Sequence, residues 1–230
     1  DNLYRIIGVF GNNVKLIKHD YATSALLGTD GDYYGTGTPN ASYYKGSLTT
    51  INTYYWNNTT QTNTWSESLL NKINLNTNFI NNIGITWSNK IATTTWKVGG
   101  GSSTYLYDVP KTAYQYEVGS SASTTTVDKK IGLMYVSDYG FAADQSAWTT
   151  KLSSYNSNTS KNWLYLGSTA WTLSRNAGNS LYAFFVVSDG TVYFNDVGSI
   201  GHGVRPSFNL LSSTTYVSGS GTMSDPVRIN

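Results

Sequence analysis

The segment 163–210 constrains the fold more than any other part of the chain. Asp189-Gly190 separates two runs, 182–188 and 191–195, that are rich in aromatic and β-branched residues. Such a break is a strong hairpin signal, because the turn needs backbone angles that Gly adopts readily. The segment therefore predicts a late β-hairpin, and the run 204–211 predicts a strand that completes a sheet with it.

Weaker signals predict an α+β chain around this hairpin. Residues 3–10 and 14–19 are apolar-rich runs around Gly11-Asn12-Asn13 and predict an opening hairpin. The run 129–136 predicts another strand, and a turn is expected after it at 137–140. We expect residues 226–229, which are also apolar, to pair with the first strand, so that the two termini meet.

One or two short helices are expected in the first half of the chain. Thr64-Trp65-Ser66-Glu67 fits the capping box that opens a helix, with apolar residues at helical spacing after it, and a second short helix is expected over 79–83. Residues 29–63 are polar and lack periodicity, which predicts long surface loops. No repeat or linker divides the chain, so residues 1–230 are predicted to form a single domain.

The composition excludes several classes of protein. Charged residues make up 12% of the chain and the net charge is +2, so the basic footprint of a nucleic-acid-binding protein is missing. There is no cysteine, which excludes disulfides, thiolate metal sites and cysteine nucleophiles. No stretch approaches the roughly 20 apolar residues that span a bilayer, so direct membrane insertion of this segment is not expected. The 19 Tyr and 7 Trp, set among Asn, Ser, Thr and Gly, are typical of β-rich extracellular proteins and of adaptable binding surfaces.

Four motifs resemble a known but uncharacterised family. They are Leu-Tyr-Arg-Ile-Ile-Gly-Val-Phe (3–10), Val-Lys-Leu-Ile (14–17), Ile-Gly-Leu-Met-Tyr-Val-Ser-Asp-Tyr-Gly (131–140) and Gly-Val-Arg-Pro (203–206). The family consists of exported domains of gut-type, low-GC Gram-positive bacteria, which often end on a motif like Gly-Ser-Gly-Thr-Met-Ser-Asp-Pro (219–226). The resemblance implies an extracellular or cell-surface location.

A more distant resemblance concerns the closing pattern, in which a late Gly-x-Arg is similar to that of C-type-lectin-like folds. These include the variable proteins of diversity-generating retroelements, which display hypervariable side chains from a rigid C-terminal scaffold. The resemblance implies a C-type-lectin-like α+β fold with mostly antiparallel sheets, and places any such variation near residues 175–202. It also implies that Arg205 is a buried, structural residue, since a buried guanidinium must be hydrogen-bonded to be tolerated.

We therefore expect a ligand-binding or display domain without catalytic activity or cofactor. Its ligand is expected to be a protein or glycan on a cell or phage surface. The candidate contacts are exposed positions of the late segment: Arg175, Asn176, Tyr182, Phe184, Tyr193, Asn195 and His202. His202 lies between two glycines, which predicts an exposed loop, whereas Trp163 and Trp171 are expected in the core.

Two other functions stay open. The chain could be a pilin-like surface subunit, whose exposed Tyr, Asn and Thr provide solvation and lateral packing. It could also be a glycan hydrolase that uses two of Glu67, Glu117 and Asp138, because such chemistry needs two carboxyl groups across a cleft. The sequence disfavours this enzyme: acidic residues are sparse, no Gly-x-Ser-x-Gly elbow is present, and neither His19 nor His202 lies in a catalytic motif.

The sequence predicts that calcium does not contribute to stability. Asp30-Gly31-Asp32 and Asp138 offer oxygens, but the Glu-Pro-Asn and Trp-Asn-Asp signatures of calcium-dependent lectins are absent. Thermal unfolding with and without a chelator should give the same melting temperature. A fall of many degrees on chelation would contradict this, because an ion bound only by the folded state raises the melting temperature.

Overall fold

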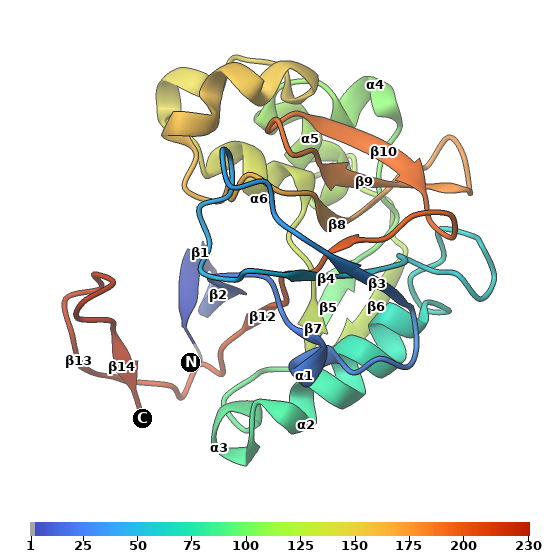
Figure 1. Cartoon of the computed structure of the whole chain (residues 1–230). Coiled ribbons are helices and arrows are strands. Elements are labelled where there is room, and N and C mark those ends of the chain that lie inside the picture. Colours follow the sequence, from blue (N-terminus) through green and yellow to red (C-terminus); the bar gives the residue numbers. More distant parts are fainter. Residues whose placement is uncertain (1–2) are drawn as a thin grey trace.

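Two β-sheets form the middle layer of the computed structural model, which describes residues 3–230 (Figure 1). Neighbouring strands are antiparallel except β8 and β11, so the expected α+β class with mostly antiparallel sheets is confirmed. The four-stranded sheet has the order β1 (Tyr4–Phe10), β2 (Asn13–Lys18), β12 (Ser207–Asn209), β7 (Ile131–Gly132). The six-stranded sheet has the order β10 (Val192–Asp196), β9 (Tyr182–Val186), β8 (Ala170–Arg175), β11 (His202–Gly203), β4 (Ile51–Tyr54), β3 (Tyr33–Gly37). Two separate ribbons pair β5 (Thr94–Lys97) with β6 (Thr126–Lys129) and β13 (Tyr216–Ser218) with β14 (Arg228–Ile229).

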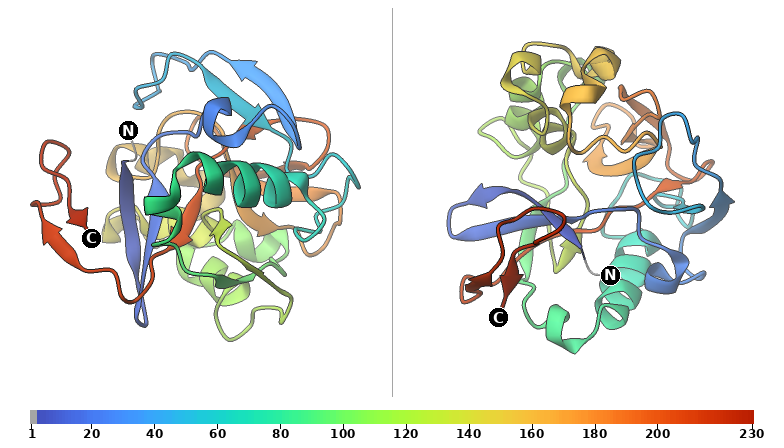
Figure 2. Two further views of the ribbon diagram at one scale, coloured as in Figure 1. Left: turned by 90° about the horizontal axis from the view of Figure 1, so that it is seen from below. Right: turned by 60° about the vertical axis from the view of Figure 1, so that its left-hand side comes forward.

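Short helices lie on both sides of this middle layer (Figures 1 and 2). On one side are α1 (Ser24–Leu27), the π-helix η1 (Leu70–Phe79), α2 (Ile80–Asn82) and α3 (Ile85–Ser88). On the other side are α4 (Ser103–Leu106), α5 (Pro110–Glu117), α6 (Val136–Phe141) and the 3-10 helices η2 (Gln145–Ala147) and η3 (Leu152–Lys161).

The sheets separate two hydrophobic cores. Successive residues of one strand belong to different cores: Leu16 packs with the core that contains η1, and Ile17 with the core that contains α6. The same alternation places Phe185 in the first core and Phe184 in the second. Side chains alternate along a strand, so the consecutive apolar residues of these two strands are buried on opposite faces.

Both expected hairpins are confirmed. In the closing hairpin Val186 pairs with Val192, and Gly190 in the connecting turn has φ +91°. In the opening hairpin Phe10 pairs with Asn13 across a two-residue turn, where Gly11 has φ +61°. These positive φ values are the reason for glycine at both turns.

The expected strand 129–136 is wrong, and so is the turn after it. β7 contains two residues, and helix α6 begins at Val136. Carboxylates fix this helix start: Glu117 accepts hydrogen bonds from the amides of Val136 and Ser137, both of 3.0 Å, and Asp138 accepts one of 2.7 Å from Tyr135. Of the apolar residues that suggested a strand, Ile131 lies in β7, residues 133–135 form a buried connection, and Val136 is the buried first residue of α6.

The helix expected from Thr64 begins later, at Leu70, although a helix over 79–83 is confirmed. Its first turn is capped by a residue distant in sequence: Asp32 accepts hydrogen bonds from the amides of Leu70 (2.7 Å) and Asn58 (3.0 Å). The capping-box residues form a tight turn, in which Glu67 donates to Thr64. Residues 29–63, expected as surface loops, are largely exposed over 38–50, but they also form the edge strand β3 and contribute β4 and the buried Trp56 to the interior.

The expected pairing of the terminal strands is also wrong. β14 pairs with β13, and β1 pairs with β2. Residues 216–218 lie close to β14 along the chain and provide a local antiparallel partner for it. The two ends of the chain nevertheless lie on the same side of the molecule (Figure 1).

Arg205 is buried, as expected, between β11 and β12. Its guanidinium donates three hydrogen bonds to main-chain carbonyls, at 3.1 Å to Lys18, 3.0 Å to His19 and 2.7 Å to Leu164. Burial lowers the pKa of Arg205 to about 10, so the group remains charged at neutral pH. It joins the end of β2 to the segment before β8.

We expect Arg205→Ala to lower the free energy of unfolding by about 3–5 kcal/mol, because three buried carbonyls lose their donors. Arg205→Lys should recover only part of this loss, since an ammonium cannot reproduce the planar guanidinium. Urea unfolding of both variants measures the effect. Arg228→Ala, which removes an exposed arginine on β14, is the control, and its free energy of unfolding should stay within about 0.5 kcal/mol of the parent. If Arg205→Ala lowered the free energy of unfolding no more than Arg228→Ala does, the structural role of Arg205 would be wrong.

Candidate functional site

The structure places the seven predicted contact residues in three different environments. Tyr193 is 53% exposed, and Tyr182, Asn195 and Arg175 are half-buried. Asn176, Phe184 and His202 are buried, so their expected exposure is wrong. For Phe184 and His202 the physical reason is that β9 and β11 are inner strands of a sheet covered on both faces, whereas Asn176 lies in the connection after β8, where its carbonyl accepts a hydrogen bond from Asn63.

Arg175 and Asn176 connect loops of the protein. Arg175 donates a hydrogen bond of 3.0 Å to the carbonyl of Gly99 and another of 3.0 Å to the side-chain oxygen of Asn63. Asn63 in turn donates to the carbonyls of Asn176 (2.9 Å) and Tyr182 (2.8 Å). These contacts hold the connection between β8 and β9 in place and occupy the polar groups expected to meet a ligand.

His202 is part of the core instead of an exposed loop. Its ring stacks on Phe185 with a centroid separation of 4.0 Å and an angle of 12°, and contacts the edge of Trp171 at 4.4 Å. Trp171 is buried, as expected, whereas Trp163 is only half-buried. Burial lowers the pKa of His202 to about 3, so the imidazole is neutral at physiological pH.

What remains exposed of the predicted surface is an aromatic rim on the edge strand β10. Tyr193 and Phe194 stack at 5.0 Å with an interplanar angle of 12°, and Tyr107 lies nearly parallel to Phe194 at 5.8 Å. Tyr182 contacts Phe194 at 4.9 Å. The rim therefore presents stacked aromatic rings, of which Tyr193 is the most exposed.

Two of the three carboxylates considered for hydrolysis, Glu117 and Asp138, form hydrogen bonds and an ion pair within the protein. Glu117 is buried, accepts from Ser174 in addition to its two amide donors, and has its pKa raised to about 7 by burial. Asp138 forms a buried ion pair with Lys15 while it caps α6. Glu67 is exposed on the turn before η1. The arrangement of Glu117 and Asp138 is that of a helix cap.

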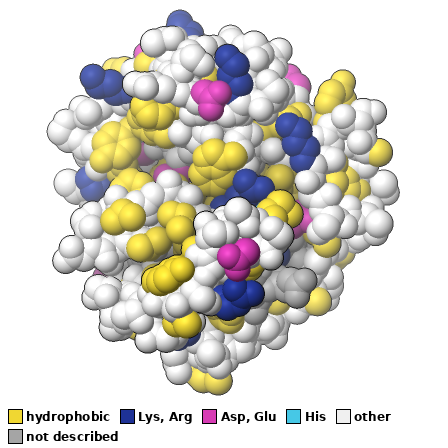
Figure 3. Space-filling model, turned by 90° about the vertical axis from the view of Figure 1, so that its left-hand side faces the viewer, with side chains coloured by type: hydrophobic (Ala, Val, Ile, Leu, Met, Phe, Trp, Pro, Cys, Tyr) yellow, Lys and Arg dark blue, Asp and Glu magenta, His cyan; other side chains and the backbone are white. Residues whose placement is uncertain are grey.

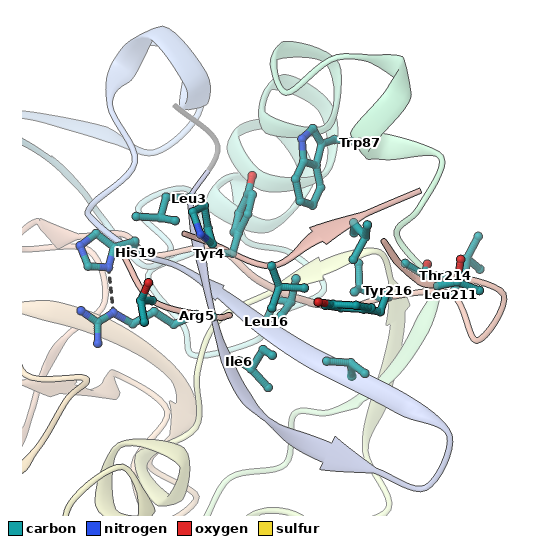
Figure 4. A pocket seen from close by; sticks show the side chains of 18 of the residues that line it. Leu3, Tyr4, Arg5, Ile6, Leu16, His19, Trp87, Leu211, Thr214 and Tyr216 are labelled. Atoms are coloured by element: carbon teal, nitrogen blue, oxygen red, sulfur yellow. Dashed lines mark hydrogen bonds between the residues drawn. The ribbon is translucent and has the colours of Figure 1, made fainter. Parts of the chain in front are cut away.

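A groove that the sequence did not predict lies between the opening hairpin and the β13–β14 ribbon (Figure 4). Its volume is about 850 Å³, within the usual range of ligand sites. Apolar and aromatic side chains line much of it: Tyr4, Ile6 and Leu16 from the opening hairpin, Trp87 from α3, and Tyr216, Met223 and Val227 from the last part of the chain. Ile6 is 54% and Met223 71% exposed, and hydrophobic side chains gather on this face (Figure 3).

Arg5 and His19 lie at the side of the groove away from Tyr216 and Leu211 (Figure 4). Arg5 is the single charged side chain among the described residues that line the groove. Its Nε donates a hydrogen bond of 2.7 Å to Nδ1 of His19, and its guanidinium lies 5.8 Å from the centre of the Trp163 ring. Burial and the nearby Arg5 lower the pKa of His19, which favours the neutral imidazole that accepts this bond.

A second, smaller hollow lies on the other face of β1. It has a volume of about 380 Å³ between β1 and α6, and its walls include Ile7, Phe10, Phe141 and Trp163. Trp163 lines both hollows. The only signal for either in the sequence is that both faces of the first strand are apolar.

Residues 3–230 hold neither a metal-binding cluster nor a membrane-spanning helix. No cluster of three or more His, Cys, Asp or Glu side chains suitable for a metal ion occurs in this part of the chain. Among the same residues, no helix combines the length and apolar character needed to cross a bilayer.

Comparison with known proteins adds no relative: no family model, curated protein or solved structure gives a significant match to this chain.

The burial of His202 predicts a loss of stability in acid. A histidine whose pKa falls from 6.5 unfolded to about 3 folded stabilises the protein fully above pH 6.5, and this contribution is lost as the pH falls toward 3. Between pH 7 and pH 4 the free energy of unfolding of the parent should therefore fall by about 3 kcal/mol relative to His202→Phe, which keeps an aromatic ring in the stack.

The difference between the two proteins, measured by urea unfolding at several pH values, isolates His202. The raised pKa of Glu117 acts in the opposite direction, since its contribution is lost as the pH rises from 4.5 through 7, but it is common to both proteins. Parallel pH profiles of parent and variant would show that His202 does not titrate as expected.

Proposed function

We propose that this chain is an exported or cell-surface domain that binds a ligand without transforming it. The groove between β1 and the β13–β14 ribbon is its binding site. The observation that carries the proposal is an open groove of about 850 Å³ with exposed apolar side chains along its walls. Apolar surface of this extent is unfavourable in water unless something covers it, which is why such patches mark interaction sites.

The proposal moves the binding surface away from the late segment. Of the predicted contacts, Tyr182, Tyr193 and Asn195 remain accessible on the aromatic rim, and they are suited to a weaker, accessory contact with a protein or glycan. Display of variable residues within 175–202 remains part of the proposal for exposed positions such as Tyr193. Inner positions such as Phe184 have no room for varied side chains, because protein interiors are close-packed.

The finer fold assignment, C-type-lectin-like, is likewise a proposal. It is supported by the buried Arg205 in the late Gly-Val-Arg-Pro segment and by long connections around antiparallel sheets. Pairing of the terminal strands, which was expected from their apolar residues, does not add to this support, because β1 pairs with β2 and β14 with β13.

A pilin-like structural role is the second candidate, and the same apolar face favours it. In that case the groove would be covered by a neighbouring subunit, and the chain would associate with itself at micromolar concentration. Sedimentation of the 230-residue chain separates the candidates: a monomer supports the binding domain, and a concentration-dependent oligomer supports the structural subunit.

The binding site is tested with Nile red, a neutral dye whose fluorescence rises in apolar surroundings. The parent should bind it, and the double variant Ile6→Asp/Met223→Asp should bind it at least about tenfold more weakly, because charges on both walls oppose an apolar ligand. Leu181→Asp, at an exposed leucine outside the groove, is the matched control and should bind like the parent. Equal binding by the double variant, with its melting temperature unchanged, would place the apolar site elsewhere.

A further inference from the structure

The inference concerns what occupies the groove and rests on the function proposed above. β1 is the outermost strand of the four-stranded sheet, with β2 on one side. Among residues 3–230, no segment hydrogen-bonds to its other edge. A seven-residue edge of this kind is a template for pairing with another strand.

The pairing pattern shows which main-chain groups are free. His19 donates to the carbonyl of Leu3 at 2.9 Å, and Lys18 donates away from β1, to Pro206 at 2.9 Å. In an antiparallel pair, residues whose amide and carbonyl bond to the partner strand alternate with residues whose amide and carbonyl point away from it. The amide and carbonyl of Tyr4, opposite Lys18, therefore face away from β2. Ile6 follows at the same spacing, before the bulge between Ile6 and Gly8. The free donors and acceptors therefore lie beside the groove.

The two hollows lie on the two faces of this same strand. Tyr4 and Ile6 line the larger groove, whereas Ile7 and Phe10 line the smaller hollow. A strand added beside β1 would direct its side chains alternately to the two faces. On each face of β1, an apolar hollow therefore lies where every second side chain of an added strand would point. Trp163 lines both hollows.

The edge lacks most of the devices that keep strands from pairing. Val9 and Phe10 are exposed, and β1 contains no proline, lysine or acidic residue. Its one charge is Arg5, which has no acidic partner among residues 3–230. His19 and Trp163 hold the guanidinium in place without neutralising it. A partner that meets this edge would gain a charge-assisted hydrogen bond by presenting a carboxylate to Arg5.

We propose that an extended segment of a partner protein adds to the free edge of β1 as a further strand, with alternating apolar side chains in the two hollows and an acidic side chain at Arg5. Main-chain hydrogen bonds to the edge supply affinity, and the hollows and Arg5 supply specificity.

The probe is a set of 27 fluorescein-labelled hexapeptides of the form X-Glu-X-Leu-X-Thr, with Val, Ile or Phe at each X. They are titrated with the folded chain and followed by fluorescence anisotropy, at peptide concentrations low enough to prevent self-association. For the tightest member, replacing Glu with Gln should weaken binding to the parent about fivefold to tenfold. The same replacement should have no effect on binding to Arg5→Gln. Arg228→Gln, at an exposed arginine on the neighbouring ribbon, should behave like the parent.

Strand pairing has its own control. N-methylation of alternate peptide amides on the edge that faces β1 should abolish binding, whereas methylation of the other amides should not. Bound peptide should also slow hydrogen exchange of the Tyr4 and Ile6 amides at least about tenfold, since these are the groups that become paired.

The outcomes separate this inference from the proposed function. If Nile red binds in the groove but no peptide of the set binds, or if methylation of either edge has the same effect, strand addition is wrong and the binding site stands. If Glu and Gln peptides bind the parent equally, the carboxylate at Arg5 is wrong. If neither dye nor peptide binds, both proposals fall.

Discussion

The buried guanidinium of Arg205 is the contact on which the rest of the structure depends. The chain crosses from the six-stranded to the four-stranded sheet between β11 and β12, and Arg205 lies at this crossing. Its three hydrogen bonds bind carbonyls from β2, from the residue after it and from the segment before β8. A charge in the interior is tolerated here because each of the three guanidinium nitrogens donates a hydrogen bond to a main-chain carbonyl, and these bonds link both sheets.

Polar contacts between segments distant in sequence also fix where two of the helices, η1 and α6, begin. With few residues in each helix, little stability comes from helix propensity, and the first turns of η1 and α6 are supported by carboxylates of other segments. Asp32 caps η1 from 38 residues away, and Glu117 caps α6 from about 20. The buried ion pair of Lys15 and Asp138 also connects strand β2 to the cap of α6. The scarce acidic residues of this chain are therefore concentrated on structural tasks.

These contacts also explain how far the sequence predicts the structure. Both hairpins were predictable, because turn glycines are local signals, and the burial of Arg205 was expected from the resemblance of its Gly-Val-Arg-Pro segment. The start of η1 was not, since its cap comes from Asp32, and the burial of His202 was not, because its glycine neighbours suggested a loop. The candidate groove could not be found from local patterns, because Ile6 and Met223 are brought together only by the fold.

The composition of the groove has a consequence for how the protein matures. One wall consists of residues near 3–16 and the other of residues near 211–229, which are the first and nearly the last parts of the described chain to be synthesised. While translation proceeds, the apolar edge of β1 is present without the ribbon that later flanks it. During synthesis the free edge of β1 is therefore open to pairing with other segments until residues 211–229 have been made, and only then does the groove gain its second wall.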